Sequence, residues 1–264
     1  MSLLAEARSR LVTGERVTRS SDGFNPNYQR HVACYRHAAA ELPPGRVLDL
    51  GAGIGHSFAE LAPRETVGLD IDAAALEGQD RETVVADMRN LPFPAGAFAS
   101  VLGVHSIEHI PDAERALGEI ARVLEPEGCC MLFTPNRLTF ARPDEIIDPY
   151  HFREYDAHEL RALAAPFFAD VEVRGLFGSP AFMELKREQS ARLDRVLGID
   201  RLRLRRFVPR KAKMLAYDYM HTRARNSTDP RAAAITPADF ELRADGLEDA
   251  LDVVLIARRP QRRA

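Results

Sequence analysis

Three histidines lie close to the ends of apolar runs that have the length of β-strands, where reactive side chains are expected. His105 and His109 bracket the end of one apolar run, Ala99–Val104, and His151 follows the next one, Cys129–Phe133. Because parallel strands bind ligands at their carboxyl ends, these side chains are expected at one edge of a sheet. An imidazole there can accept a proton near neutral pH, as a reacting hydroxyl requires. A histidine at the start of a helix can also simply hydrogen-bond to the backbone, so position alone leaves the role open.

A glycine-rich segment is the second place where the sequence can bind a ligand. Gly51-Ala-Gly-Ile-Gly55 follows the apolar run Arg46–Leu50, and glycines there allow positive φ and close approach to the backbone. The dinucleotide fingerprint fails, because the third glycine arrives one residue early and His56 stands where Gly or Ala is needed. The Gly-Lys-Ser or Gly-Lys-Thr of a phosphate loop is also missing. The spacing favours a nucleotide-like ligand without a pyrophosphate.

Two acidic residues end the next two apolar runs. Asp70 follows Thr66–Leu69, where an acid can hold ribose hydroxyls, and Asp87 follows Thr83–Ala86. A lone glycine turn is a weak signal, because such turns occur in many unrelated α/β proteins. Three elements in this order indicate a nucleoside-containing ligand much more strongly.

These residues need a parallel sheet to bring them together. Short apolar runs alternate with helical segments from Arg46 to Leu176, with helices predicted at Gly55–Leu61, Ala73–Leu76 and Ala113–Leu124. This alternation is typical of a parallel sheet covered on both faces. A last apolar run, Leu251–Ala257, needs a sheet to join. We therefore predict an α/β, Rossmann-like fold. It has a mostly parallel seven-stranded sheet, helices on both faces and a helical insertion before the last strand.

The same alternation divides the chain. Residues 1–45 are predicted to be an N-terminal helical extension, 46–176 and 236–264 the sheet core, and 177–235 the insertion. The insertion is rich in Arg and Lys, which is usual for a solvated face of amphipathic helices. The alternative is a lid over an acceptor site, which we favour; a separate C-terminal domain is disfavoured by the last strand.

Composition excludes several classes of protein. The 264 residues with 45% apolar content can bury the core of one large α/β domain, and the net charge of −3 argues against a chain-wide basic field for nucleic acid. The sequence contains no run of about 18 uncharged apolar residues, so we expect no membrane span. The three cysteines form no disulfide framework and fit a reducing compartment. We expect a cytoplasmic protein with no nucleic-acid partner and no integral membrane association; the sequence does not predict its oligomeric state.

Taken together, these motifs resemble the class I S-adenosylmethionine-dependent methyltransferases of the type 11-like group, whose members methylate quinones, sugars and small metabolites. The matching text is Val47-Leu-Asp-Leu-Gly-Ala-Gly-Ile-Gly55, Val67-Gly-Leu-Asp-Ile-Asp72, Ala86-Asp-Met-Arg-Asn-Leu-Pro-Phe93, His105-Ser-Ile-Glu-His-Ile-Pro-Asp112 and Arg122-Val-Leu-Glu-Pro-Glu-Gly128. One departure is Ala99, where such proteins usually carry Asp, but this position begins a strand far from the transferred methyl group.

The resemblance implies S-adenosylmethionine as cofactor and a set of cofactor-binding residues. Asp49, Gly51 and Gly53 line the methionine moiety, and Gly55 permits the close turn. Asp70 takes the ribose hydroxyls and Ile71 packs on adenine. Asp87 accepts the adenine amino group beside the Met88 backbone, and His105 lies along the methionine end.

The resemblance also bears on catalysis. Related sugar O-methyltransferases can carry their base at the place of His109, which makes His109 our first candidate for the base and His151 the second. No metal is expected, because no pair of acidic residues with a partnering histidine has metal-site spacing, and Asp70 and Asp72 are explained by ribose and helix capping.

Downstream segments narrow the resemblance. Thr134-Pro-Asn-Arg-Leu-Thr-Phe140 and Ala234-Ile-Thr-Pro-Ala-Asp-Phe-Glu-Leu242 are similar to the mycofactocin oligosaccharide methyltransferases, which implies O-methylation of a glucose hydroxyl on a glycan. The alternatives are an O-methyltransferase for a quinone, a lipid or another secondary metabolite, and a protein that binds S-adenosylmethionine without catalysis. An NAD-linked oxidoreductase is disfavoured by the glycine spacing.

Overall fold

The computed structural model describes residues 26–140, 146, 148–198, 208–209, 211–214 and 229–261. The described parts of Met1–Arg30, Asp148–Tyr150 and Gly178–Phe240 form one compact unit. Those of His31–Ile147, His151–Phe177 and Glu241–Ala264 form a second unit. The predicted domain boundaries and the lid role stay predictions, and half of the Arg and Lys residues of the insertion lie outside the described residues.

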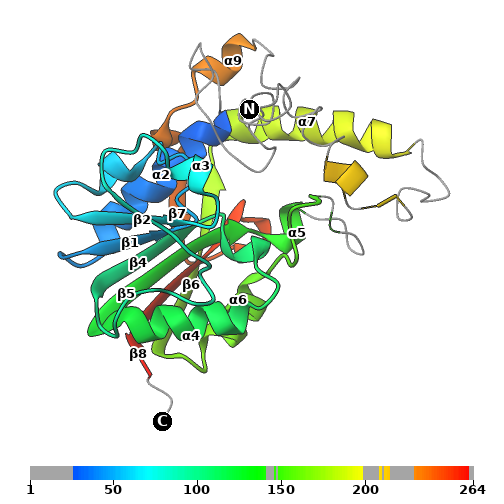
Figure 1. The fold of residues 1–264 in the computed structure, drawn as a ribbon. Helices are drawn as coiled ribbons and strands as arrows, with labels where there is room; N and C mark the ends of the chain where they lie inside the picture. Colours follow the sequence, from blue (N-terminus) through cyan, green and yellow to red (C-terminus); the bar gives the residue numbers. More distant parts are fainter. Residues whose placement is uncertain are drawn as a thin grey trace. The chain divides into compact units, whose positions relative to one another are not determined.

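A sheet of eight strands, in the order β3-β2-β1-β4-β5-β8-β6-β7, forms the centre of the fold (Figure 1). Strands β3, β2, β1, β4 and β5 run parallel, and β8 runs antiparallel to both β5 and β6. The bounds are β1 (Val47–Leu50), β2 (Thr66–Asp70), β3 (Glu82–Val85), β4 (Phe98–Val104), β5 (Leu124–Pro135), β6 (Phe168–Gly178), β7 (Phe240–Arg243) and β8 (Asp252–Pro260).

The predicted fold class is confirmed, and one detail of it is corrected. The sequence predicted seven strands, and the eighth is β7. Its four residues alternate in burial too briefly to give a clear period-2 signal in the sequence. The predicted continuous apolar runs hold best at β4, where all seven residues are buried, as expected for a strand covered on both faces.

Helices connect the strands. Their bounds are α2 (Pro26–Glu41), α3 (Ala73–Leu76), α4 (Ala113–Val123), α5 (Arg137–Phe140), α6 (Ala157–Ala164), α7 (Pro180–Gly198) and α9 (Pro230–Ala233), and the 3₁₀ turns are η1 (Phe58–Leu61), η2 (Ile107–His109), η4 (Pro237–Asp239) and η5 (Leu247–Asp249). A helix predicted at Gly55–Leu61 is reduced to η1. The reason is that Gly55 has φ +67 and Pro63 follows closely, which leaves room for a single turn.

The two sides of each strand pack against different helices. Leu48, Leu50 and Val101 belong to the hydrophobic cluster that also includes the buried faces of α4 and α6. The residue between the two leucines, Asp49, points to the opposite side, because successive side chains of a strand alternate. Figure 1 shows α4 and α6 together on one side of the sheet.

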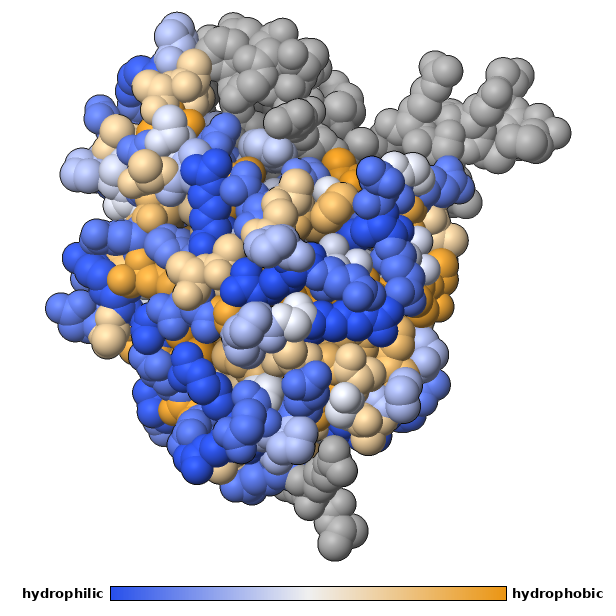
Figure 2. Space-filling view, turned by 90° about the vertical axis from the view of Figure 1, so that its left-hand side faces the viewer, coloured by the Kyte–Doolittle hydropathy of each residue, from blue (hydrophilic) through white to orange (hydrophobic). Residues whose placement is uncertain are grey.

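Caps determine where the helices that frame the sheet begin. Asp112 accepts a hydrogen bond from Arg115 N at the start of α4, and Asp156 and Glu159 form a capping box at the start of α6. Among the described residues, none of the helices is both long and apolar enough to cross a membrane. Figure 2 shows one face of the molecule, on which hydrophilic and apolar residues are interspersed.

Candidate functional site

The glycine loop, residues 51–55, turns β1 away from the sheet through three left-handed residues. Gly51, Gly53 and Gly55 have φ of +68, +52 and +67. The backbone N–H of Gly51 donates to Leu69 O at 2.8 Å, which ties the loop to the end of β2. A Cβ at Gly51 would lie 2.7 Å from the Cβ of Ser106, whereas a Cβ at Gly53 would meet nothing within 4 Å. The loop therefore needs glycine for its shape and leaves the backbone at Gly53 open to a ligand.

Asp70 anchors this loop from the end of β2. Its Oδ2 accepts a hydrogen bond from Gly53 N and its Oδ1 accepts one from Asp72 N, both at 2.9 Å. The next residue, Ile71, is 71% exposed. A carboxylate and an exposed apolar side chain thus stand side by side at the carboxyl edge, as a ribose and a flat base would require.

Asp87 lies at the same edge. The backbone N–H of Ala86 donates to Asp70 O at 3.1 Å, which holds the ends of β2 and β3 together. The guanidinium of Arg89 donates to both carboxylate oxygens of Asp87, and these hydrogen bonds lower the pKa of Asp87. Asp87 therefore stays an ionised acceptor near neutral pH, and its neighbour Met88 is buried.

Asp49 is buried beneath the loop and faces two partners that the sequence did not reveal. Tyr35 Oη donates to its Oδ1 at 2.9 Å, and Arg81 Nη2 lies 2.8 Å from its Oδ2. The side chains of Arg81 and Asp49 are 3% and 1% exposed. Burial raises the pKa of Asp49, and the charge of Arg81 opposes this rise. The carboxylate predicted to line the methionine moiety thus points toward Tyr35 and Arg81.

Arg81 connects this buried pair to the loop. Its Nε donates to Gln79 Oε1 at 2.9 Å, and Gln79 Nε2 donates to Gly53 O at 2.7 Å. Its guanidinium lies 4.3 Å from the ring centre of Phe58. It also crosses Gly68, where a Cβ would lie 2.8 Å from Nη2. A glycine inside a strand often marks such a close approach, so Gly68 is the signal that could have pointed to Arg81.

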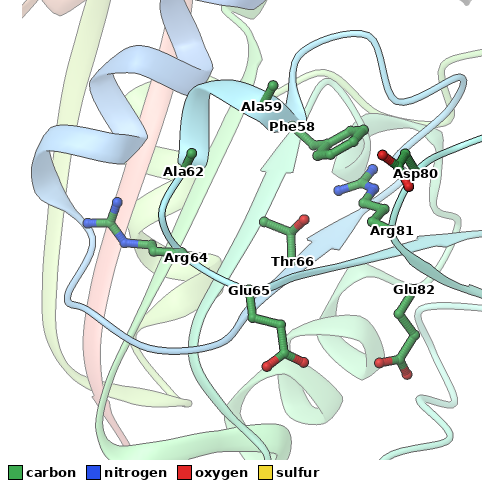
Figure 3. Close-up of a pocket in the computed structure, with 9 residues that line it drawn as sticks. All are labelled: Phe58, Ala59, Ala62, Arg64, Glu65, Thr66, Asp80, Arg81 and Glu82. Carbon is green, nitrogen blue, oxygen red and sulfur yellow. The ribbon is translucent and has the colours of Figure 1, made fainter.

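The same arginine lines a pocket at the opposite edge of the sheet. Figure 3 shows this pocket, with Phe58, Asp80 and Arg81 around one end. Thr66 and Glu82, which also line it, are the first residues of β2 and β3. Because the pocket lies at the amino ends of these strands, it is separate from the carboxyl edge that carries the predicted residues.

His105 begins the loop after β4 with an unusual backbone. It has φ +51, and its Nε2 lies 2.9 Å from Oδ1 of Asp252, a fully buried residue at the start of β8. The ring of His31 stands edge-on to His105 with 4.6 Å between the ring centres, and His56 lies 5.6 Å from His31. The sequence indicated no functional role for His31, His56 or Asp252, which come from three separate segments of the chain.

A histidine cluster, which we define as Glu108, His109, His151 and Glu154, forms beside the ends of β4 and β5. The rings of His109 and His151 lie 5.0 Å apart at an angle of 72°. The two predicted base candidates are therefore neighbours. His151 Nδ1 lies 2.9 Å from Glu154 Oε1, and the two side chains are 5% and 1% exposed.

Glu108 completes the histidine cluster from its buried side. Its Oε2 accepts a hydrogen bond from Thr134 Oγ1 at 3.0 Å, and its backbone oxygen accepts one from Phe152 N at 2.8 Å. One donor atom each of Glu108, His109 and His151 lies within 4.8 Å of the others. The sequence predicted no metal, because no pair of acidic residues with a partnering histidine has metal-site spacing.

Comparison with known proteins gives consistent matches. A family model described as a methyltransferase domain matches residues 48–132. A probable S-adenosylmethionine-dependent methyltransferase of Mycobacterium tuberculosis is 31% identical over 262 residues, which cover 94% of this chain and 89% of that protein.

Solved structures agree on the fold. A methyltransferase structure from Thermotoga maritima superposes with a TM-score of 0.59 at 16% identity, covering 89% of this chain and 91% of that one. The phosphoethanolamine N-methyltransferase 2 of Haemonchus contortus, solved with S-adenosylhomocysteine, superposes with a TM-score of 0.54 at 18% identity. The superposition covers 89% of this chain and 53% of the Haemonchus contortus protein.

Proposed function

The chain belongs to the S-adenosylmethionine-dependent methyltransferases, and from this premise we propose that it methylates a hydroxyl group of a small molecule or glycan. S-adenosylmethionine is its cofactor and supplies a methyl group bonded to a positively charged sulfur. The task of the chain is to bind this donor and to hold the acceptor oxygen in line with the carbon–sulfur bond, and such orientation can supply much of the acceleration.

The carboxyl edge fits this cofactor. The backbone at Gly53 faces open space, and Asp70 stands beside it with a carboxylate that can also accept from ribose hydroxyls. Ile71 offers an exposed apolar side chain for the adenine, and Asp87 offers an ionised acceptor for its amino group. We propose that His105, held by Asp252, borders the methionine end.

The histidine cluster is the observation that supports oxygen as the acceptor atom. A hydroxyl must lose its proton as it is methylated, and a positioned imidazole is a common acceptor for it. Glu154 fixes the orientation of the His151 ring, which packs against His109, in the way that a carboxylate orients a catalytic histidine. A neutral amine is already nucleophilic before it loses a proton, so it has less need of a histidine–carboxylate pair. His109 is the first candidate to take the proton, and His151 the second.

Our first candidate for the acceptor is a glucose hydroxyl of the mycofactocin oligosaccharide. The resemblance that suggests it includes the segment beginning at Thr134, and this threonine contacts Glu108 of the histidine cluster. A quinone, a lipid or another secondary metabolite is the alternative acceptor. A protein that binds S-adenosylmethionine without catalysis is the alternative from another class.

A transfer assay tests the proposal. The protein is incubated with S-adenosylmethionine labelled in its methyl group and with a panel of glycans, quinols and small phenols. We expect label in a methyl ether of a glycan. Label in phenols and not in glycans would exclude the sugar acceptor. Binding of S-adenosylhomocysteine in calorimetry without transfer to any hydroxyl would favour the non-catalytic alternative.

A further inference from the structure

We infer that Glu108, His109 and His151 form a binding site for one divalent transition-metal cation, which activates the acceptor hydroxyl. The activating role rests on the proposed function, whereas the binding of the cation does not. The three residues present one carboxyl oxygen and two imidazole nitrogens within 4.8 Å of one another. Two imidazoles and a carboxylate suit zinc, iron, cobalt or manganese better than magnesium or calcium, which prefer oxygen ligands.

The carboxyl group of Glu108 is the observation that points to a ligand. Its side chain is fully buried, and Thr134 occupies only Oε2. The other oxygen, Oε1, has no hydrogen-bond partner among the described residues. A buried acceptor without a partner destabilises the fold, and more so when it is charged. A cation bound by Oε1 would remove this destabilisation.

His151 is oriented as a metal ligand would be. Its Nδ1 is engaged by Glu154 Oε1 at 2.9 Å, so a cation would be bound through Nε2. A carboxylate behind a histidine is a common outer partner of metal-bound imidazoles, because it fixes the ring and raises its basicity. The second oxygen of Glu154 also lacks a hydrogen-bond partner within the described part of the chain. Each of the two buried carboxyl groups of the histidine cluster thus has one oxygen without a hydrogen-bond partner among the described residues.

Backbone hydrogen bonds hold the ligands together without any cation. The N–H groups of Phe152 and Arg153 donate to Glu108 O at 2.8 and 3.3 Å. These bonds join the segment after His151 to the turn η2, which carries the other two ligands. The site is therefore built by the fold, and three protein ligands leave a coordination position for an acceptor oxygen.

The cation would act as a Lewis acid in the transfer. A divalent metal would lower the pKa of an acceptor oxygen bound to it, as it does for zinc-bound water, whose pKa is about 7. The proton of the acceptor O–H group passes to solvent water, and a lone pair of the oxygen forms the new O–C bond. The C–S bond breaks with its electron pair retained by sulfur, so nothing is oxidised or reduced. With the cation bound, His109 is a ligand and no longer the proton acceptor.

Titration with Co²⁺ tests the site directly. The full-length protein is freed of metal with a chelator and titrated with Co²⁺, and visible absorption and calorimetry are recorded. We expect one equivalent to bind and to give absorption bands of a cobalt ion with nitrogen and oxygen ligands. The bands should be lost in His151→Ala and in Glu108→Gln. They should persist in His158→Ala, which removes an exposed histidine of α6 outside the cluster.

Further outcomes decide the inference. Glu154→Gln keeps every ligand and should weaken Co²⁺ binding about 10- to 100-fold. Circular dichroism melting establishes that each variant is folded. If His151→Ala does not fold, Glu108→Gln alone tests the site. Absence of Co²⁺ binding, or binding that both ligand variants retain, overturns the site. Hydroxyl methylation at full rate in the metal-free protein overturns the activating role but leaves the proposed function intact. If the protein binds Co²⁺ but methylates no hydroxyl, the metal site is supported and the proposed function is contradicted.

Discussion

The glycine loop and the histidine cluster lie at the same edge of the sheet but differ in whether their buried carboxyl groups face a cation. Both oxygens of Asp70 accept backbone hydrogen bonds, and the buried carboxylate of Asp49 faces a tyrosine hydroxyl and a guanidinium. Asp49 Oδ2 makes no hydrogen bond of good geometry, but it forms an ion pair with Arg81 Nη2 at 2.8 Å. In the histidine cluster, Glu108 Oε1 and Glu154 Oε2 also have no hydrogen-bond partner, and within the described residues neither carboxyl group is paired with an arginine or lysine.

This difference separates two tasks. A loop that must keep an unusual backbone shape before its ligand arrives needs a rigid support, and the polar network under it provides one. Groups that must bind or deprotonate something during a reaction cannot be used up by the fold, and such unsatisfied groups gather at functional sites. Changes under the loop should therefore act on stability and donor binding, and changes in the cluster on turnover.

The largest expected effect on turnover comes from the histidine cluster. His109→Ala should lower kcat about 10²- to 10⁴-fold, the usual contribution of a group that assists proton loss. The direction is the same if the imidazole acts through a cation. Affinity for S-adenosylhomocysteine should not change, because the side chain lies outside the glycine loop. Steady-state kinetics and calorimetry measure both quantities, with His158→Ala as the matched control. Full turnover in His109→Ala would remove this residue from the reaction.

The largest expected effect on stability comes from the support of the glycine loop. Arg81→Met should lower the free energy of unfolding by about 3–5 kcal/mol, because it leaves the buried Asp49 without its cation. Urea denaturation measures this change. The matched control is Arg36→Met, which removes an exposed pair with Glu60 and should cost at most about 1 kcal/mol. Equal losses in the two variants would show that burial does not distinguish these pairs.

The same contrast explains how far the sequence could be read. The glycine loop, Asp70 and Asp87 follow successive strands at short spacing, so the fold class and the cofactor were predictable and are confirmed. The individual roles given to the cofactor residues, and the base roles of His109 and His151, stay predictions. The helix expected at Gly55–Leu61 was wrong, because the periodicity there gave no weight to the left-handed Gly55.

What the sequence could not give is the pairing of distant side chains. Arg81 reaches Asp49 across β2, and the glycine at position 68 is the sequence feature that indicates the space it needs. Glu154 follows His151 by three residues, a spacing that carries no meaning until the segment is tied to Glu108 by backbone hydrogen bonds. These contacts depend on strand order and loop closure, which composition and periodicity do not encode.

A smaller effect is expected from the shape of the loop itself. Gly51→Ala places a Cβ on a residue with φ +68, which costs about 1–2 kcal/mol, and brings it to 2.7 Å from Ser106 Cβ. We expect a lower melting temperature and weaker binding of S-adenosylhomocysteine. The control is Gly78→Ala, which has φ +75 and nothing within 4 Å. It should lower the melting temperature alone, and donor affinity lost equally in both variants would contradict a special role of the loop.

The smallest effect separates donor binding from stability most cleanly. Ile71 is 71% exposed, so Ile71→Ser removes little buried surface from the folded chain and should leave the melting temperature unchanged. If adenine covers this side chain, binding buries part of an isoleucine, which is worth up to about 1.5–3 kcal/mol. The serine variant should then bind S-adenosylhomocysteine about tenfold more weakly in calorimetry, a change of about 1.4 kcal/mol. Ile71→Leu keeps the apolar area and should retain the affinity. An unchanged affinity in Ile71→Ser would place the adenine elsewhere, whereas a lower melting temperature would mean that Ile71 supports the loop as Arg81 does.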